Sequence, residues 1–221
     1  MLSLPRVAPI LLLVLGFVGV AVPAQADAAR HVVSIATART LPLGTVVTVD
    51  GSATTPSGAF ESSFFDKGFG LQDRSAGIYV SIGTDLGIAP RTQVRVTGTL
   101  RTSFGLLILV PASPAAVKAH GTGPKVRAER HLTGAIGEAT EGRLVRVVAR
   151  VTRAPASDLP FGFIFFVNDG SGELQIFVNT QTNIDLTGLA VGQLVSVTGF
   201  SSQFDTHYEI DPRFQADLVT R

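Results

Sequence analysis

The pentapeptide VRVTG at residues 94–98 returns as VSVTG at residues 195–199, 101 positions further along (195 minus 94). In both, valines alternate with polar residues ahead of a glycine, which is the pattern of a strand with one buried face. A glycine inside a strand indicates a sharp bend or a close backbone approach. The two pentapeptides therefore predict the same bent strand twice, in two copies of one β module.

The segments around the pentapeptides match in the same order. Residues 43–58 (LGTVVTVDGSATTPSG) align with 141–156 (EGRLVRVVARVTRAPA), and residues 69–82 (FGLQDRSAGIYVSI) align with 165–178 (FFVNDGSGELQIFV). The offsets of 98, 96 and 101 residues (142 − 44, 169 − 73, 199 − 98) differ only as loop insertions require. Between the copies, AHGTGPK at 119–125 gathers glycine and proline without a strand pattern, so a domain boundary is expected there.

Each copy contains five predicted strands and no long amphipathic helix. A long first strand is followed by a hairpin around a turn that starts with aspartate or asparagine, residues that make Asx hydrogen bonds. Five strands in this order are typical of the OB-fold, so we expect an all-β chain with two tandem five-stranded OB-fold-like barrels. The expected domains are residues 32–118 and 126–221, the fifth strands are LLILV at 106–110 and HYEID at 207–211, and single helical turns are expected at 34–38 and within 133–142.

The segments LGTVVTVDG, GFGLQDRSAGIYV and VRVTGTL resemble the nucleic-acid-binding OB-fold modules of exported bacterial proteins, including domains appended to extracellular nucleases. The resemblance covers nearly all of residues 32–221 and implies a nucleic-acid ligand. The second copy departs from the pattern, because Val148-Ala149 replaces Asp50-Gly51 and Glu173-Leu174-Gln175 replaces Gly77-Ile78-Tyr79. The pattern is more specific for the fold than for the ligand, since OB-folds bind oligonucleotides and oligosaccharides.

The first 26 residues resemble a secretory signal peptide. Arg6 precedes the apolar run Ile10–Val22, and Ala24 and Ala26 occupy the small-residue positions of a cleavage site. The run is 13 residues long, shorter than the roughly 20 that span a bilayer. We therefore expect cleavage after Ala26, a secreted or periplasmic protein and no membrane span in the mature chain, with an uncleaved anchor as the alternative.

Composition excludes several kinds of site. The chain has no cysteine, so disulfides, thiol nucleophiles and cysteine metal sites are impossible. Removing Arg6 leaves 17 basic against 17 acidic residues, so no global field attracts nucleic acid and only a local patch serves. The four histidines form no metal-binding spacing, and neither a serine-nucleophile elbow nor a phosphate-binding loop is present. We expect no cofactor and no enzyme.

An OB-fold usually binds its ligand on the face of strands two and three. Alternation directs Phe166, Gln175 and Phe177 outward in the second copy, where aromatic rings stack bases and arginines of strand one meet phosphates. The first copy offers a tyrosine, an aromatic turn residue and two arginines of strand four. The predicted ligand-binding residues are Arg146, Arg150, Phe166, Gln175, Phe177, Tyr79, Arg95, Arg101 and Phe104.

Alternative interpretations stand beside this one. Phe166 and Phe177 are also explained as interdomain or dimer contacts, and each arginine as a solvated edge residue. The segment FESSFF at 60–65 either grips a ligand or folds back as a lid on its own barrel. The carboxylates Asp205, Glu209 and Asp211 are expected at the surface.

Two functions follow from these observations. The first is an exported, non-catalytic protein that binds single-stranded nucleic acid or assists a nucleic-acid-processing partner. The second is a structural or adaptor module of the cell envelope that binds a protein or glycan, with its sheet faces used for contacts between domains or with the partner. Zero net charge of the mature chain favours the second.

Overall fold

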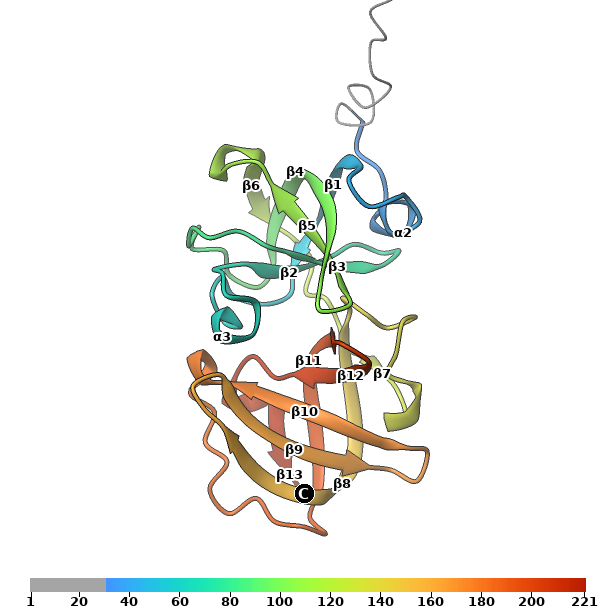
Figure 1. The fold of residues 1–221 in the computed structure, drawn as a ribbon, viewed down its shortest axis with the longest axis vertical. Coiled ribbons are helices and arrows are strands. Elements are labelled where there is room, and N and C mark those ends of the chain that lie inside the picture. Colours follow the sequence, from blue (N-terminus) through green and yellow to red (C-terminus); the bar gives the residue numbers. More distant parts are fainter. Residues whose placement is uncertain (1–30) are drawn as a thin grey trace, which may run out of the picture.

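The computed structural model describes residues 31–221, and the predicted leader with its cleavage site after Ala26 lies outside these residues. The described chain forms two β-sheets stacked along the long axis of the molecule, accompanied only by short helices (Figure 1). Within the described residues, none of the helices has the length and apolar character needed to cross a membrane.

The first sheet closes on itself into a barrel. Its strands run in the order β1-β2-β3-β5-β4-β6, and a further pairing of β1 with β4 closes five of them into a ring. The strands are β1 (Val46–Ala53), β2 (Phe69–Gln72), β3 (Gly77–Val80), β4 (Thr92–Ser103), β5 (Leu106–Pro111) and β6 (Val117–Thr122), with helices α2 (Ile35–Arg39), α3 (Glu61–Phe64) and the 3₁₀ turn η1 (Pro114–Ala116).

The second sheet repeats this topology. Its order is β13-β11-β12-β10-β9-β8-β7, and β11 pairs with β8 to close the ring. The strands are β7 (Glu129–Arg130), β8 (Leu144–Asp158), β9 (Gly162–Asn168), β10 (Glu173–Asn179), β11 (Leu194–Phe204), β12 (His207–Asp211) and β13 (Leu218–Thr220), with 3₁₀ turns η2 (Thr133–Ala135), η3 (Thr180–Thr182) and η4 (Gln215–Asp217). The expected all-β fold with OB-fold-like barrels is confirmed.

The register of the two barrels reproduces the sequence alignment. Gly98 pairs with Val47 in the first barrel, and Gly199 pairs with Val145 in the second. At these glycines the fourth strand passes from the first strand to the fifth. A Cβ on Gly98 would lie 2.9 Å from the Val110 backbone, and one on Gly199 would lie 2.4 Å from the Asp211 carbonyl oxygen. Close approach of the fifth strand's backbone therefore requires glycine at both positions, whereas the predicted strand bend stays a prediction.

The two hairpin turns, which resemble each other in sequence, make equivalent hydrogen bonds to the helical segment that precedes the first strand of each barrel. Asp73 accepts a hydrogen bond from the Ile35 backbone N–H at 2.8 Å, which fixes the start of α2 against the β2–β3 turn. Asp169 accepts one from the Thr133 N–H at 3.0 Å, which fixes η2 against the β9–β10 turn. In each case the serine two residues later also binds the helical turn. The aspartates thus hold the segment before strand one to the hairpin.

Each barrel has its own core from the inward-facing alternation predicted for the hairpin strands. In the first barrel the core includes Phe69, Leu71, Ile78 and Val80, all fully buried. In the second it includes, with others, Phe165, Val167, Leu174, Ile176 and Val178.

Two segments extend beyond their predicted ends. Residues 119–122, expected to lack a strand, continue β6, which pairs with β4. Strand β8 runs on to Asp158 through two irregularities in its pairing with β9, at Val151/Arg153 and Arg153/Ala156. The alternation of apolar residues ends at Val151, so the sequence pattern carried no sign of this extension.

Candidate functional site: a groove between the two barrels

The outer face of β2 and β3, where an OB-fold usually takes its ligand, is covered by the second barrel. Every residue of both strands is buried, on the outward as well as the inward positions. A third apolar cluster fills the space between the barrels, formed by Ala59, Phe60, Tyr79, Leu106, Ile108 and Phe200, and only Phe200 comes from the second barrel. This face of the first barrel is therefore an interface within the chain.

The prediction that Tyr79 stacks a ligand is wrong. The side chain does point out of its barrel, but it is 0% exposed, stacked on Phe64 at 4.0 Å between ring centroids and set against the edge of Phe200 at 5.9 Å. Its hydroxyl donates to Asp66 Oδ1 at 2.9 Å. Burial, followed by the nearby Asp66 carboxylate, raises the pKa of Tyr79 well above its ordinary value. Tyr79 is an interdomain contact, as the alternative interpretation held for residues on these faces.

Glycines bring the two barrels into backbone contact. A Cβ on Gly77 would lie 1.9 Å from the Gly142 carbonyl oxygen, and one on Gly70 would lie 2.9 Å from the Phe200 ring. Such distances leave no room for any other residue at these two positions. Gly77 lies in the hairpin of the first copy. The equivalent position in the second copy is Glu173.

Polar contacts fasten the same interface. Arg39 reaches across to Glu141 at 2.9 Å, and the buried Glu141 also accepts a hydrogen bond from the Leu107 backbone at 3.2 Å. On another side of the interface, Arg213 donates to the Thr54 carbonyl oxygen at 2.6 Å. Because both backbone and charged side chains are engaged, the barrels are held in one relative orientation.

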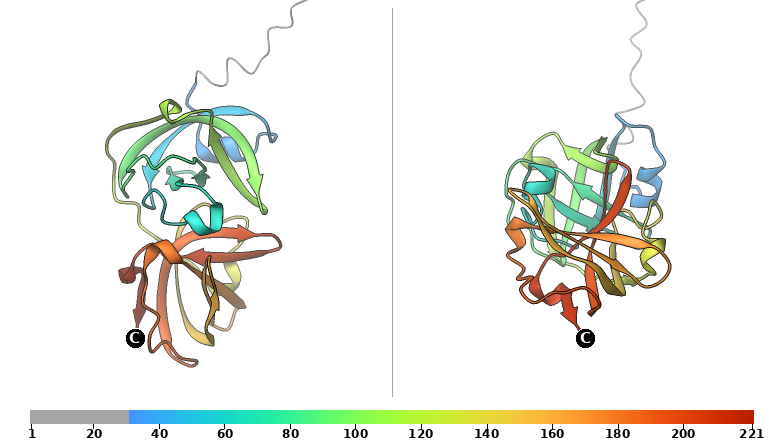
Figure 2. Two further views of the ribbon diagram at one scale, coloured as in Figure 1. Left: turned by 60° about the vertical axis from the view of Figure 1, so that its left-hand side comes forward. Right: turned by 60° about the horizontal axis from the view of Figure 1, so that its bottom comes forward.

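The segment Phe60–Phe65 carries α3 across to the second barrel (Figure 2, left). The Ser62 hydroxyl donates to the Phe161 carbonyl oxygen at 2.6 Å, and the Ser63 hydroxyl donates to Asn179 Oδ1 at 2.5 Å. The Phe65 ring meets Phe161 edge to face at 5.8 Å. The segment therefore bridges the two barrels and does not close over its own barrel alone.

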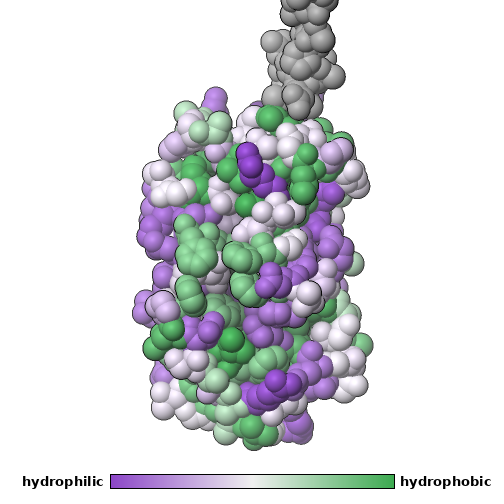
Figure 3. Space-filling view, viewed as in Figure 1, coloured by the Kyte–Doolittle hydropathy of each residue, from purple (hydrophilic) through white to green (hydrophobic). Residues whose placement is uncertain are grey.

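Beside the covered interface, a groove of about 360 Å³ opens between the barrels. Hydrophobic residues gather across the middle of the molecular face at the level where the halves meet (Figure 3). Both barrels contribute walls, so the groove exists only when they are docked. Its lining consists of Ser62, Ser63, Phe64, Phe65, Ser103, Phe104, Asp158, Phe161, Ile164, Gln175, Phe177, Ser202, Gln203, Phe204, His207 and Glu209.

Aromatic rings form most of the walls. Phe104 from the β4–β5 turn stacks on Phe204 from the β11–β12 turn at 5.0 Å, and they are 49% and 42% exposed. Phe177 lies deeper, at 7% exposure. The groove thus presents aromatic faces of the kind that stack on planar rings or cover the apolar face of a sugar.

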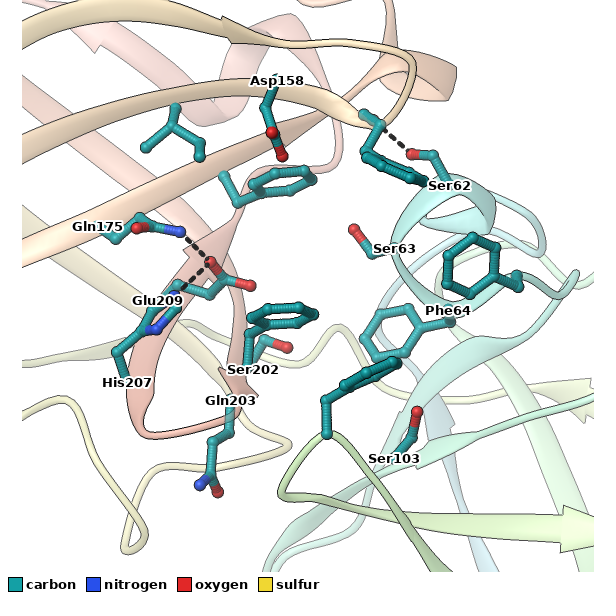
Figure 4. Close-up of a pocket in the computed structure, with 16 residues that line it drawn as sticks. Ser62, Ser63, Phe64, Ser103, Asp158, Gln175, Ser202, Gln203, His207 and Glu209 are labelled. Atoms are coloured by element: carbon teal, nitrogen blue, oxygen red, sulfur yellow. Dashed lines mark hydrogen bonds and ion pairs between the residues drawn. The ribbon is translucent and has the colours of Figure 1, made fainter.

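The polar end of the groove is built by β10 and β12. Gln175 Nε2 donates to Glu209 Oε2 at 2.6 Å, and His207 Nε2 lies 3.7 Å from the same oxygen. The other carboxyl oxygen of Glu209 is directed toward the cavity (Figure 4). The interaction with Glu209 raises the pKa of His207 above its ordinary value, while partial burial of the ring opposes the shift. Asp158 is the only other charged residue of the lining, which holds no lysine or arginine.

The acidic residues of β12 are not at the surface, contrary to expectation. Glu209 is 5% exposed and Asp211 is fully buried, because odd-numbered residues of β12 face the first barrel. Neither carboxyl oxygen of Asp211 has a hydrogen-bond partner among the described residues. Burial, followed by the neighbouring Glu209, raises the pKa of Asp211 well above its ordinary value. Asp211 is therefore a buried carboxyl group within the interface whose neutral form is favoured by its surroundings.

The structure gathers three of the predicted ligand-binding residues in the groove, namely Gln175, Phe177 and Phe104. Phe166 lies next to it, since it pairs with Gln175 across β9 and β10. Its half-buried ring is covered by the Arg153 guanidinium, 4.2 Å from the ring centroid. The outer face of β9 and β10 thus leads from Phe166 through Gln175 into the groove at Phe177.

The predicted arginines lie apart from one another. Arg146 donates to Ser196 Oγ at 2.7 Å and Arg150 donates to the Gly192 carbonyl oxygen at 2.8 Å, so both lean toward β11 and away from β9. Arg95 pairs with Asp50 at 2.9 Å beside a second, polar hollow. Arg101 is exposed on β4, two residues before the groove residue Ser103. Of the four, Arg101 is the closest along the chain to a residue of the groove lining.

Sequence patterns missed the residues that the docking of the barrels supplies. Phe161, Phe204 and Asp158 lie in connections or strand ends, and no alternation pattern marks them. Glu209 carried one signal, since β10 and β12 pair Gln175 with Glu209 as β3 and β5 pair Tyr79 with Ile108. This position on the fifth strand is the apolar Ile108 in the first barrel, whose face is covered, and the acidic Glu209 in the second barrel, whose face borders the groove. Across residues 31–221, no cluster of three or more histidine, cysteine, aspartate or glutamate residues is arranged to hold a metal ion.

The chain was compared with known protein families, curated proteins and solved structures. No protein-family model matches the chain. The endonuclease YhcR of Bacillus subtilis strain 168 is 30% identical over 133 residues, which cover 57% of this chain and 11% of that endonuclease. The match therefore spans only a small part of the relative's length.

Several solved structures are similar to this chain at low sequence identity. A murine DNA-binding protein bound with double-stranded DNA has a TM-score of 0.41 and 11% identity, covering 74% of this chain and 90% of its own. The tetrameric p202 HIN2 structure has a TM-score of 0.39 and 12% identity, covering 80% and 94%. The hypothetical protein ygiW from E. coli has a TM-score of 0.32 and 16% identity, covering 41% and 90%. At these scores we draw nothing about function from the likeness.

Proposed function

We propose that this chain is an exported, non-catalytic module that binds a short stretch of single-stranded nucleic acid in the groove between its barrels, alone or beside a nucleic-acid-processing partner. The observation that carries the proposal is that Phe104, Gln175 and Phe177 line one groove, with Phe166 paired to Gln175 beside it. The partial similarity to an endonuclease supports the same ligand class.

The ligand enters with its bases inward. The groove has aromatic walls and no lysine or arginine, so it suits bases and repels phosphates. The basic side chains proposed to contact the backbone are Arg101, exposed on β4 two residues before Ser103, and Arg153, which covers Phe166 and pairs with Glu173. A duplex keeps its bases stacked inside, so binding requires unpaired nucleotides.

Fluorescence anisotropy with a labelled ten-nucleotide single strand tests the proposal. Two phosphate contacts give a slope of log K against log salt of about −1.4, since each contact to a single strand contributes about −0.7. Replacing Phe104 by alanine removes one stacking face, worth roughly 1–3 kcal/mol, and weakens binding by about 5- to 150-fold. Phe214→Ala is the matched control, because Phe214 is 39% exposed and lies outside the groove. Absence of binding at low salt, or equal loss in both variants, would refute the proposal.

A second candidate is an envelope adaptor that binds a glycan or protein. The carboxylates of Asp158 and Glu209 in an aromatic groove favour it, because sugar hydroxyls donate to carboxylates while sugar faces pack on rings. Competition decides between the two. A neutral oligosaccharide that displaces the labelled strand at lower concentration than unlabelled strand would favour the adaptor.

Export rests on the leader sequence alone. Mass spectrometry of the protein recovered outside the cytoplasm of an expressing bacterium tests it. A chain that begins at Asp27 supports export with cleavage after Ala26, whereas a full-length chain found only in the cytoplasm contradicts it.

A further inference from the structure

Three arginines lie close together on the outside of the second barrel, away from the groove lining. Arg146 and Arg150 alternate with the core residues of β8 and therefore point outward, and Arg130 of β7 pairs with Arg146. At about 3.3 Å per residue, Arg146 and Arg150 are roughly 13 Å apart along the strand, and Arg130 is one strand spacing, about 4.8 Å, from Arg146. Together the three residues form the arginine face.

The fold does not require these charges. The first barrel makes the same strand pairings with neutral residues at the three equivalent positions, namely Val32, Thr48 and Ser52. An OB-fold-like barrel therefore closes without arginine at any of them, and the charges are a feature of the second copy alone.

Protection of a free strand edge does not explain the two arginines of β8. Arg146 lies between β7 and β11, and Arg150 lies between β9 and β11. Charged residues guard strands whose backbone groups are open to pairing with another sheet. Because β8 has a partner strand on both edges at these two positions, it has no such edge to guard there.

The charges of the arginine face are not neutralised by nearby carboxylates. Arg146 donates to the Ser196 hydroxyl and Arg150 to the Gly192 carbonyl oxygen, both neutral acceptors that orient the guanidinium groups. Among residues 31–221, none of the three arginines forms a salt bridge. Arg130 and Arg150 are also exposed, so their charges are open to a partner.

Spacing and chemistry define that partner. Charges spread over about 13 Å suit an extended polyanion better than one small anion. The outward residues on the neighbouring strands are aliphatic or carry hydroxyls, namely Leu194, Ser196, Thr198 and Val219, so the face offers no ring for an unpaired base to stack on. A duplex keeps its bases inside and presents about one phosphate charge per 1.7 Å, roughly eight over this length.

We propose that the arginine face binds the phosphate backbone of a double-stranded nucleic acid, as a second site separate from the groove. Its contacts are to phosphates alone, so the site has no sequence preference. The inference goes beyond the proposed function, because the groove takes unpaired nucleotides and the arginine face takes a duplex.

Fluorescence anisotropy with a labelled twenty-base-pair duplex tests the proposal. Three phosphate contacts give a slope of log K against log salt of about −2.7, since each contact to B-form DNA contributes about −0.9, and affinity then falls about 40-fold between 50 and 200 mM salt. Arg130→Gln/Arg150→Gln removes the two exposed charges, so the slope is expected to shrink to about −0.9 and the duplex to bind more weakly at 50 mM salt.

The matched control is Arg91→Gln/Lys118→Gln, which removes two exposed charges from the first barrel and is expected to keep the wild-type slope. Circular dichroism melts verify that both variants fold. No duplex binding at 50 mM salt, or an equal loss in both variants, overturns the inference. Binding of heparin or of phosphatidylglycerol vesicles without binding of the duplex assigns the face to another polyanion and also overturns it.

The outcome is separable from that of the proposed function, which concerns single strands in the groove. Duplex binding that depends on Arg130 and Arg150, together with single-strand affinity unaltered by Phe104→Ala, refutes the proposed function and leaves this inference standing. Single-strand binding that weakens with Phe104→Ala, in a protein that binds no duplex, overturns this inference alone.

Discussion

Truncation of Phe200 tests whether the two barrels form one folding unit. Phe200 belongs to neither barrel core and is 0% exposed in the cluster between them, with its ring 6.1 Å from Phe60 and 5.9 Å from Tyr79. Replacing a fully buried phenylalanine by alanine costs about 3–5 kcal/mol. For a chain of this size, 1 kcal/mol lowers Tm by roughly 2–4 °C, so Phe200→Ala lowers Tm by about 6–20 °C.

Differential scanning calorimetry supplies the measurement. The wild type is expected to unfold in one transition, because backbone contacts, ion pairs and an apolar cluster join its halves. In Phe200→Ala we expect the lower Tm together with a broadened or divided transition, as the barrels lose their shared cluster. Phe204→Ala is the control on the same strand; its ring is 42% exposed, and each of its ring contacts, with Phe104 and His207, contributes at most about 1.5 kcal/mol. A Phe200→Ala shift below about 2 °C would refute the claim that this cluster joins the barrels.

Three further predictions concern the interface and the turns. Gly77→Ala places a Cβ 1.9 Å from the Gly142 carbonyl oxygen and should lower Tm strongly, whereas Gly83→Ala, with nothing within 4 Å, should not; equal melts would contradict the contact. The pKa of Asp211 is raised in the folded chain, so its contribution to stability is full below its unfolded pKa and declines as pH rises through the folded pKa. Asp211→Asn should therefore gain stability relative to the wild type as pH increases. Urea denaturation at several pH values measures this, and a difference in stability that does not change with pH would count against it. Hydrogen bonds from Ser171 and Thr133 lower the pKa of Asp169, although burial opposes them. The contribution of Asp169 to folding stability is therefore present above its unfolded pKa and lost as pH falls. Asp169→Asn should cost stability at pH 7 and little in strong acid, and a stability difference that does not depend on pH would exclude this contribution.

The repeat made much of the fold predictable. Alternating residues such as Ile78 and Val80 identified the inward faces because a barrel strand with one buried side has a period of two. The offsets between the copies reappear in the register, where Gly98 and Gly199 occupy equivalent crossings. Local patterns were sufficient here because each barrel is built from contacts within its own copy.

The site was only partly predictable, since it arises where the copies meet. Outward alternation correctly placed Tyr79 and Phe177 outside their cores, but no local pattern says what covers an outward face. The second barrel covers Tyr79, while Phe177 borders the open groove. The carboxylates Glu209 and Asp211 read as surface residues for the same reason. Docking of the barrels, which depends on glycine contacts such as Gly77 with Gly142, determines which outward-facing residues are buried and which border the groove.

Photocrosslinking of a single strand that carries one 5-iodouracil tests the central claim, that the ligand lies in the groove between the barrels. Tryptic mass spectrometry of the adduct locates the contact. We expect adducts on the groove aromatics Phe104, Phe177 and Phe204. Adducts confined to the polar hollow around Arg95 and Lys118, with the groove peptides unmodified, would contradict the account.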